Sequence, residues 1–251
     1  MLTLGVDLAA KDEKTALCLI TWDDEPPRVE RLVSRDASDD MIKALSDDAD
    51  IVAIDAPFGW PIPFVDAVSA YGAGSGWPSE QPRGLWFRRT DCLVQATIGG
   101  RWPLSVSSDR IARPAERAAR LLTLLGSPGR PASRDGSDAI IEVYPAGALR
   151  HWSIGTDGYK ERGAVSLRAE ICDALLAGAS LRMTADERAA LTATDHPLDA
   201  LVAALVGRAF SLDRTTLPEG EDIPVARREG WIHLPTVGLD QLGVPETADR
   251  A

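Results

Sequence analysis

The order of the predicted secondary-structure elements is the feature of this sequence that most restricts its fold. Three short apolar strands follow one another closely within residues 3–34, and this spacing is typical of antiparallel hairpins. A short helix is predicted at 37–48, and a fourth strand at 50–57 returns after it, as parallel strands do. The remaining predictions are a fifth strand ending at Pro145, helices at 166–178, 184–191 and 195–210, and a small terminal strand within 229–235.

This order predicts an α/β protein with a mixed five-stranded sheet, in which three antiparallel strands precede parallel strands and helices flank the sheet. The ribonuclease H-like fold has this order. A Rossmann unit opens with a glycine-rich turn from a strand into a helix, whereas here the first strand leads into a second strand. With 251 residues and 45% hydrophobic residues, we predict one domain over 1–251.

A long insertion is predicted after the fourth strand, at residues 60–135. Its first part, 60–107, is crowded with Pro, Gly, Trp and Ser and is expected to be irregular. Residues 113–126 form a predicted helix, with Pro114 in its first turn and Gly126 at its end. The arginines of this helix are expected to lie away from its apolar face.

Three aspartates are predicted to meet at one edge of the sheet. Asp7 ends the first strand and Asp55 ends the fourth, and these strands are neighbours in a sheet of this order. Sites in open α/β sheets form at the carboxyl ends of strands. Asp199 shares a face of the helix at 195–210 with Val202 and Val206, so it is expected to face the sheet.

Three neighbouring carboxylates repel one another, and a divalent cation removes this conflict. Carboxylate oxygens suit Mg²⁺ or Mn²⁺, and the scattered histidines and cysteines give no zinc pattern. Simpler roles remain open for each acid: Asp55 as a turn residue, Asp195 as a helix N-cap, and Asp199 as a partner of the helix dipole.

The sequence also resembles a known family. The segments "GVDLA", "AIDAPFGWP", "RRTD", "IEVYPA", "YK" and "HPLDALVAA" follow one another as in domain of unknown function 429, whose members are described as predicted nucleases of the ribonuclease H fold. By this resemblance, the three acids are metal ligands with Asp195 as a helper. Resolvases commonly have Glu on strand four, so Asp55 is shorter by one methylene.

The resemblance implies further site residues. The family motifs fall on Arg89, Asp91, Glu142, Tyr144 and Lys160. Glu142 and Lys160 are candidate catalytic residues, and Arg89 is a candidate phosphate clamp. Ordinary roles remain open here too: Glu142 in an ion pair with an arginine, the neighbouring arginines in a salt bridge with Asp91, and Lys160 at the surface.

The insertion is strongly basic although the chain carries a formal net charge of −11. Between Arg83 and Arg134, ten arginines stand against three acidic residues, which gives this stretch +7. Trp86, Phe87 and Trp102 are interleaved with them, as in channels where arginines contact phosphates and aromatic rings stack on bases. Arg88 and Trp86 are therefore candidate substrate-binding residues. An amphipathic helix and a local core explain the same pattern. The ten arginines are at positions 83, 88, 89, 101, 110, 113, 117, 120, 130 and 134.

These observations favour a Mg²⁺- or Mn²⁺-dependent nuclease or phosphodiesterase, with nucleic acid as its partner. Two alternatives are an ATP-binding phosphotransferase of the actin-like or sugar-kinase type and a non-catalytic binding protein on the same fold. The hairpin after Asp7 lacks the glycines that would hold ATP phosphates. The absence of a signal-like start and the unpaired cysteines predict a cytoplasmic protein.

Overall fold

A computed structural model of the protein describes residues 1–80, 82–100 and 102–243, so Arg101 of the basic stretch lies outside the described residues. Within them, six strands form one sheet in the order β3-β2-β1-β4-β5-β6. The strands are β1 (Leu2–Asp7), β2 (Ala16–Thr21), β3 (Arg28–Val33), β4 (Ile51–Asp55), β5 (Ile140–Val143) and β6 (Ile232–His233). The first three strands are antiparallel, and β1, β4, β5 and β6 are parallel. The predicted mixed sheet is confirmed, with the small terminal strand as a sixth member.

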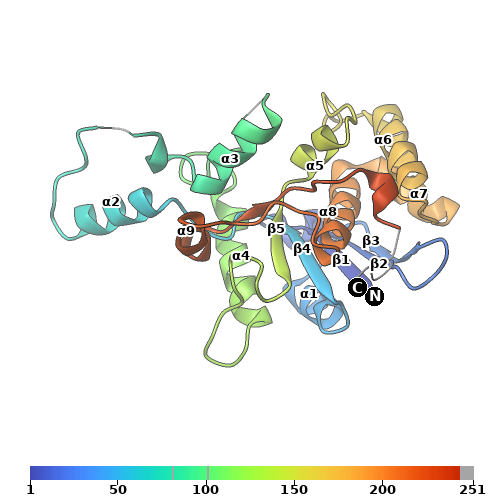
Figure 1. Cartoon of the computed structure of the whole chain (residues 1–251), viewed down its shortest axis with the longest axis horizontal. Coiled ribbons are helices and arrows are strands. Elements are labelled where there is room, and N and C mark those ends of the chain that lie inside the picture. Colours follow the sequence, from blue (N-terminus) through green and yellow to red (C-terminus); the bar gives the residue numbers. More distant parts are fainter. Residues whose placement is uncertain (81, 101, 244–251) are drawn as a thin grey trace, which may run out of the picture.

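Helices cover both faces of this sheet (Figure 1). α1 and α4 pack on one face, and α8 lies across β1, β2 and β4 on the other, with α5, α6 and α7 beside it. The longer helices are α1 (Asp39–Ser46), α2 (Ile62–Gly72), α3 (Arg89–Ile98), α4 (Ala112–Leu125), α5 (Pro145–His151), α6 (Val165–Gly178), α7 (Ala185–Ala193), α8 (Asp195–Ser211) and α9 (Asp222–Glu229). No helix of the described residues is long and apolar enough to span a membrane.

The alternation of side chains along the strands decides which residues face α8. Successive side chains of a strand point to opposite faces. In β4, Val52 and Ile54 pack in the core under α1 and α4, whereas Ile51 and Ala53 pack in the core under α8. The same alternation puts Asp55 on the α8 side, at the end of its strand.

A glycine lets α8 lie unusually close to β1. A side chain at Gly5 would place its Cβ against the backbone carbonyl of Ala200 and the backbone nitrogen of Ala204, and 3.0 Å from the Ala204 Cα. Cβ atoms essentially never approach other heavy atoms more closely than this. The missing side chain at Gly5 therefore sets the distance between the strand that ends in Asp7 and the helix that carries Asp199.

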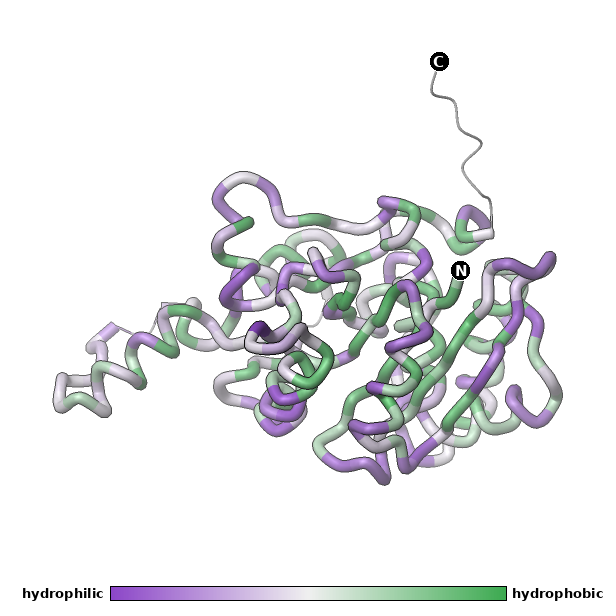
Figure 2. Tube along the Cα trace, turned by 90° about the horizontal axis from the view of Figure 1, so that it is seen from below, coloured by the Kyte–Doolittle hydropathy of each residue, from purple (hydrophilic) through white to green (hydrophobic). Residues whose placement is uncertain are grey.

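The prediction that residues 60–107 are irregular is only partly right. They contain α2 and α3, and α2 projects from the body of the molecule, where its contacts are with the segment 83–85 and with α9 (Figure 2). Only Ala67 of α2 is buried, so the helix shows no buried stripe from which it could be recognised. In α3, the Asp91 side chain accepts a hydrogen bond from the backbone N–H of Arg88, the N-cap residue just before the helix.

The helix predicted at 113–126 is confirmed as α4, but Arg117 does not lie away from the core. Its side chain is 3% exposed, and its guanidinium donates to the carbonyl of Ala9 at 2.9 Å and to the hydroxyl of Thr15 at 2.7 Å. It also pairs with Asp12 and Asp39, both at 2.7 Å. Arg117 thus fixes the loop that follows Asp7 onto α1 and α4.

Candidate metal centre

The structure brings together the three aspartates that the sequence placed at one edge of the sheet. Asp7 and Asp55 are register partners at the ends of parallel strands β1 and β4. Asp199 reaches them from the first turns of α8. One carboxylate oxygen of each residue lies within 4.8 Å of the others. Asp199 is 1% exposed and Asp7 is 9% exposed, so water screens these charges poorly.

Burial and mutual repulsion make the ionised form of this group costly. Two unit charges at 4.8 Å repel by about 3.5 kcal/mol at an effective dielectric constant of ~20. Burial raises the pKa of Asp7 to about 6, against a hydrogen bond from His196 that lowers it and with the charge of Asp199 adding to the rise. Burial also holds the pKa of Asp55 well above its ordinary value, opposed by Lys160 and reinforced by Asp7.

Three neighbouring side chains partly offset this charge. The ammonium of Lys160 lies 2.6 Å from Oδ2 of Asp199, and the hydroxyl of Tyr159 donates to Oδ1 of the same residue at 2.8 Å. His196 Nδ1 lies 2.6 Å from Oδ2 of Asp7. This hydrogen bond raises the pKa of His196, although burial acts against it.

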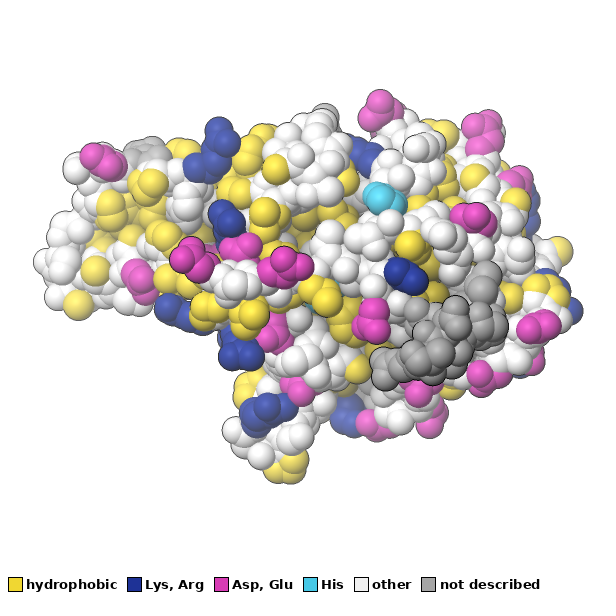
Figure 3. All heavy atoms as spheres, viewed as in Figure 1, with side chains coloured by type: hydrophobic (Ala, Val, Ile, Leu, Met, Phe, Trp, Pro, Cys, Tyr) yellow, Lys and Arg dark blue, Asp and Glu magenta, His cyan; other side chains and the backbone are white. Residues whose placement is uncertain are grey.

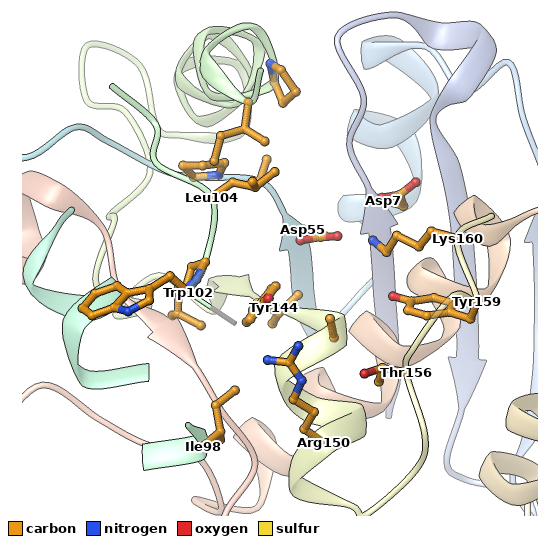
Figure 4. A pocket seen from close by; sticks show the side chains of 18 of the residues that line it. Asp7, Asp55, Ile98, Trp102, Leu104, Tyr144, Arg150, Thr156, Tyr159 and Lys160 are labelled. Carbon is orange, nitrogen blue, oxygen red and sulfur yellow. The ribbon is translucent and has the colours of Figure 1, made fainter. Parts of the chain in front are cut away.

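Two of the clustered acids, Asp7 and Asp55, line a cleft of about 1140 Å³. In Figure 4, the Lys160 ammonium points toward the carboxyl groups of Asp7 and Asp55, and the guanidinium of Arg150 points into the same space from α5. The cleft is large enough for a ligand of nucleotide size. The basic residues Arg110, Arg150 and Lys160 are among those that line this cleft together with the two acids.

Glu142 and Arg88 form a separate, buried ion-pair network. Arg88 donates through Nη1 and Nη2 to the two carboxylate oxygens of Glu142, at 2.8 and 2.7 Å, and through Nη2 to Asp91 at 2.9 Å. The backbone N–H of Phe58 donates to Glu142 at 2.9 Å. Burial lowers the pKa of Arg88, but the two acids outweigh it, so the pKa is raised and the guanidinium stays charged.

Strand alternation keeps Glu142 out of the aspartate cluster. Its register partner on β4 is Ile54, whose side chain lies on the face opposite α8. Arg88 is 2% exposed, and together with Asp91 and Glu142 it forms part of the wall of the cleft that Asp7 and Asp55 also line. The structure shows the ion pair between Glu142 and an arginine that the sequence analysis left open, and both side chains are buried. The network joins the segment after β4 to β5 and α3.

The other candidate residues lie in different surroundings. Asp195 is the first residue of α8, after the N-cap residue Thr194, and is not one of the three clustered acids. Arg89 pairs with Asp222 on α9 at 2.7 Å and does not line the cleft within the described residues. Tyr144 lines the cleft as the residue before α5, whereas Trp86 is 39% exposed and lies outside it.

Several arginines of the basic stretch make contacts within the protein. Arg88 and Arg117 are buried in ion pairs, and Arg83 lies over the ring of Trp102, 4.6 Å from its centroid. Figure 3 shows Lys and Arg side chains mixed with Asp and Glu around α9 on the visible face, rather than gathered into a patch. Arg110 lines the cleft. Arg83, Arg88 and Arg117 of the basic stretch thus make contacts with acidic or aromatic side chains of the protein itself.

Several cleft residues were not recognised from the sequence, among them Tyr159, His196 and Arg150. His196 stands three positions before Asp199, a spacing that puts both on one helix face, so the pattern contained a signal. Arg150 stands four positions after Ala146 on α5, and both line the cleft. The sequence alone did not indicate how α5 is placed relative to the three aspartates.

The donor set fits a hard divalent cation. Opposite ligands around Mg²⁺ lie about 4.2 Å apart, since each oxygen is about 2.1 Å from the ion. The three oxygens, which lie within 4.8 Å of one another, would have to move closer together to bind one such ion. Three carboxylates with no cysteine among them suit Mg²⁺ or Mn²⁺ better than a thiophilic metal.

Fold and site together define a mixed α/β protein with three clustered carboxylates where two neighbouring parallel strands end. Residues 5–223 match the family described as Protein of unknown function (DUF429). The chain therefore belongs to this family, as its motifs predicted. No curated protein and no solved structure matched the chain.

Proposed function

We propose that this protein is a divalent-metal-dependent phosphodiesterase of the ribonuclease H-like type that acts on nucleic acid. The observation that carries the proposal is the approach of Asp7, Asp55 and Asp199, whose oxygens lie within 4.8 Å of one another. Strongly raised pKa values for two of these acids support it, because perturbed acids in a cleft are typical of functional sites. A purely structural role would be served as well by neutral side chains.

The residues of the cleft would divide the work. The three aspartates would hold Mg²⁺ or Mn²⁺, which supplies an activated water and neutralises charge on a phosphoryl group. Arg150 would bind a phosphate oxygen, in place of Arg89, which points elsewhere. His196, bonded to Asp7, would hold that carboxylate in one orientation. Arginines outside the cleft, from the stretch Arg83–Arg134, would contribute contacts to more distant phosphates.

The test begins with metal binding, measured by calorimetry with Mn²⁺ and with Mg²⁺. Asp7→Asn and Asp55→Asn should each lower the affinity for Mn²⁺ at least tenfold, because each removes one charged ligand. Asp195→Asn is the matched control, since Asp195 lies on the same helix as Asp199 but outside the cluster. It should bind the ion as the wild type does.

Activity is then measured on single-stranded DNA, duplex DNA, RNA and a small chromogenic phosphodiester, with Mn²⁺ and with chelator. Metal-dependent cleavage that Asp7→Asn abolishes and Asp195→Asn retains would support the proposal. Absence of Mn²⁺ binding in the wild type would refute it. An ATP titration that shows tight, Asp7-dependent binding would instead favour the phosphotransferase alternative.

A further inference from the structure

Lys160 is held at the carboxylate cluster by a rigid piece of loop. Its neighbour Tyr159 is 2% exposed and donates its hydroxyl to Asp199. The buried guanidinium of Arg168 donates to the backbone carbonyl of Tyr159 at 2.7 Å and to that of Glu161 at 3.1 Å. The same guanidinium also donates to the carbonyls of Thr192 and Ala193, just before α8. The backbone on both sides of Lys160 is thereby fixed to the start of α8.

This anchoring makes the position of Lys160 a built feature rather than that of a surface lysine. The side chain is 49% exposed, yet its ammonium lies 2.6 Å from Asp199, which is 1% exposed. Its charge also stabilises the ionised forms of Asp7 and Asp55. In Asp199, Oδ1 accepts a hydrogen bond from Tyr159 and Oδ2 has the ion pair with Lys160 as its contact, whereas the side chain of Asp55 has no hydrogen bond or ion pair among the described residues.

We propose that Lys160 is the resident cation of this cluster, so that the three aspartates take up one divalent ion instead of two. The proposal rests on the proposed metal-dependent function. Three carboxylates carry a charge of −3, and Lys160 with one divalent ion balances it. A second divalent ion, which in two-metal sites lies about 3.5–4 Å from the first, would need the place at Asp199 that the ammonium fills.

The number of bound ions distinguishes a site with Lys160 and one divalent ion from a site with two divalent ions. Native mass spectrometry and calorimetry with Mn²⁺ should give one ion per chain for the wild type. Lys160→Met keeps the length of the side chain and removes its charge, so two ions should bind. Lys160→Arg keeps the charge and should bind one. Lys43→Met is the matched control, because Lys43 also pairs with an aspartate, Asp47, but lies on α1; it should bind one ion.

Thermal denaturation gives a second measurement that requires no activity. In chelator, Lys160→Met leaves the three carboxylates without their cation and should melt below the wild type, and Mn²⁺ should raise its Tm by more degrees than that of the wild type. Circular dichroism verifies that the variant is folded. Because Lys160 is half exposed, its replacement removes little packing.

Each outcome decides the inference. Two ions in the wild type, or one in Lys160→Met, would overturn it. If only Lys160→Met binds Mn²⁺, Lys160 is the resident cation, and the proposed metal-dependent function of the wild type fails. If neither protein binds Mn²⁺, both proposals fail.

Discussion

Gly5 provides a direct test of how the fold assembles the aspartate cluster. The substitution Gly5→Ala adds a single methyl group on the face of β1 that α8 covers. The added Cβ would collide with the backbone at Ala200 and Ala204. Backbone atoms inside a helix cannot rotate away as a side chain does, so the whole helix must move. Asp199 is the residue before Ala200, and it would move with the helix.

The structure sets the expected magnitude. To restore ordinary contact, α8 must shift by on the order of 1 Å, because Cβ contacts below 3.0 Å essentially never occur. Overpacking of a core costs about 1–3 kcal/mol, and a collision with helix backbone belongs at the upper end of this range. For a domain of this size, about 3 kcal/mol corresponds to a Tm lower by about 6–12 °C. Displacement of Asp199 should weaken Mn²⁺ binding about 10–100-fold, as disturbed ligand support does.

Gly207→Ala is the matched control, since it adds the same methyl group on the same helix. Its Cβ would lie 3.4 Å from the Cβ of Ala53 and 3.5 Å from Ile51, which are ordinary contacts. Alanine also favours the helix by up to about 1 kcal/mol. We expect its Tm and its Mn²⁺ affinity to equal or exceed those of the wild type. A Gly5→Ala protein that melts and binds Mn²⁺ like this control would refute the argument.

Three further predictions concern charged residues in and around the cleft. Glu142→Gln leaves the buried Arg88 with Asp91 alone and should lower the free energy of unfolding by about 3 kcal/mol in urea titrations; a loss below about 1 kcal/mol would contradict the role of the network. Asp7→Asn should stabilise the metal-free protein at pH 7.5, by on the order of 2 kcal/mol, and have little effect at pH 3.5. The sign follows from the pKa of Asp7, which is raised from 3.8 to about 6, so the folded state holds the proton more tightly and stability is lost as the pH rises through this window; an equal effect at both pH values would contradict it. Arg150→Met should raise the KM for a phosphodiester about tenfold or more and leave Mn²⁺ affinity unchanged, since it removes a charged hydrogen bond to substrate but no metal ligand; an unchanged KM would remove Arg150 from the site.

The sheet could be predicted because each strand is a short apolar run that can be recognised from a few consecutive residues. The run at 51–55 is apolar on both faces and ends in an acid, which marks both a buried strand and its carboxyl end. The arm around α2 could not be predicted, because its helix buries only Ala67 and therefore lacks the periodicity by which helices are recognised. α9 was missed for the same reason, with few buried positions among charged ones.

The site was predictable as far as backbone geometry determines it. Strand order and helix periodicity place Asp7, Asp55 and Asp199 together without knowledge of any side-chain conformation. The contacts of Lys160 and Arg150 depend on how the segments after β5 fold back over the sheet, and this is decided by packing between residues distant in sequence. The family motifs pointed to Glu142, but its buried network follows from the face of β5 on which it lies.

The aspartate cluster is a local conflict that the rest of the fold tolerates. Strand register aligns Asp7 with Asp55, and the missing side chain at Gly5 admits Asp199, so two separate features of the backbone combine to bring like charges together. Because burial raises the pKa of two of these acids, a neutral residue at Asp7 should make the empty protein more stable. Proteins commonly give up stability of this kind at functional sites, where a ligand restores it. This arrangement of residues therefore requires that a divalent cation stabilise the wild type and not the Asp7→Asn variant.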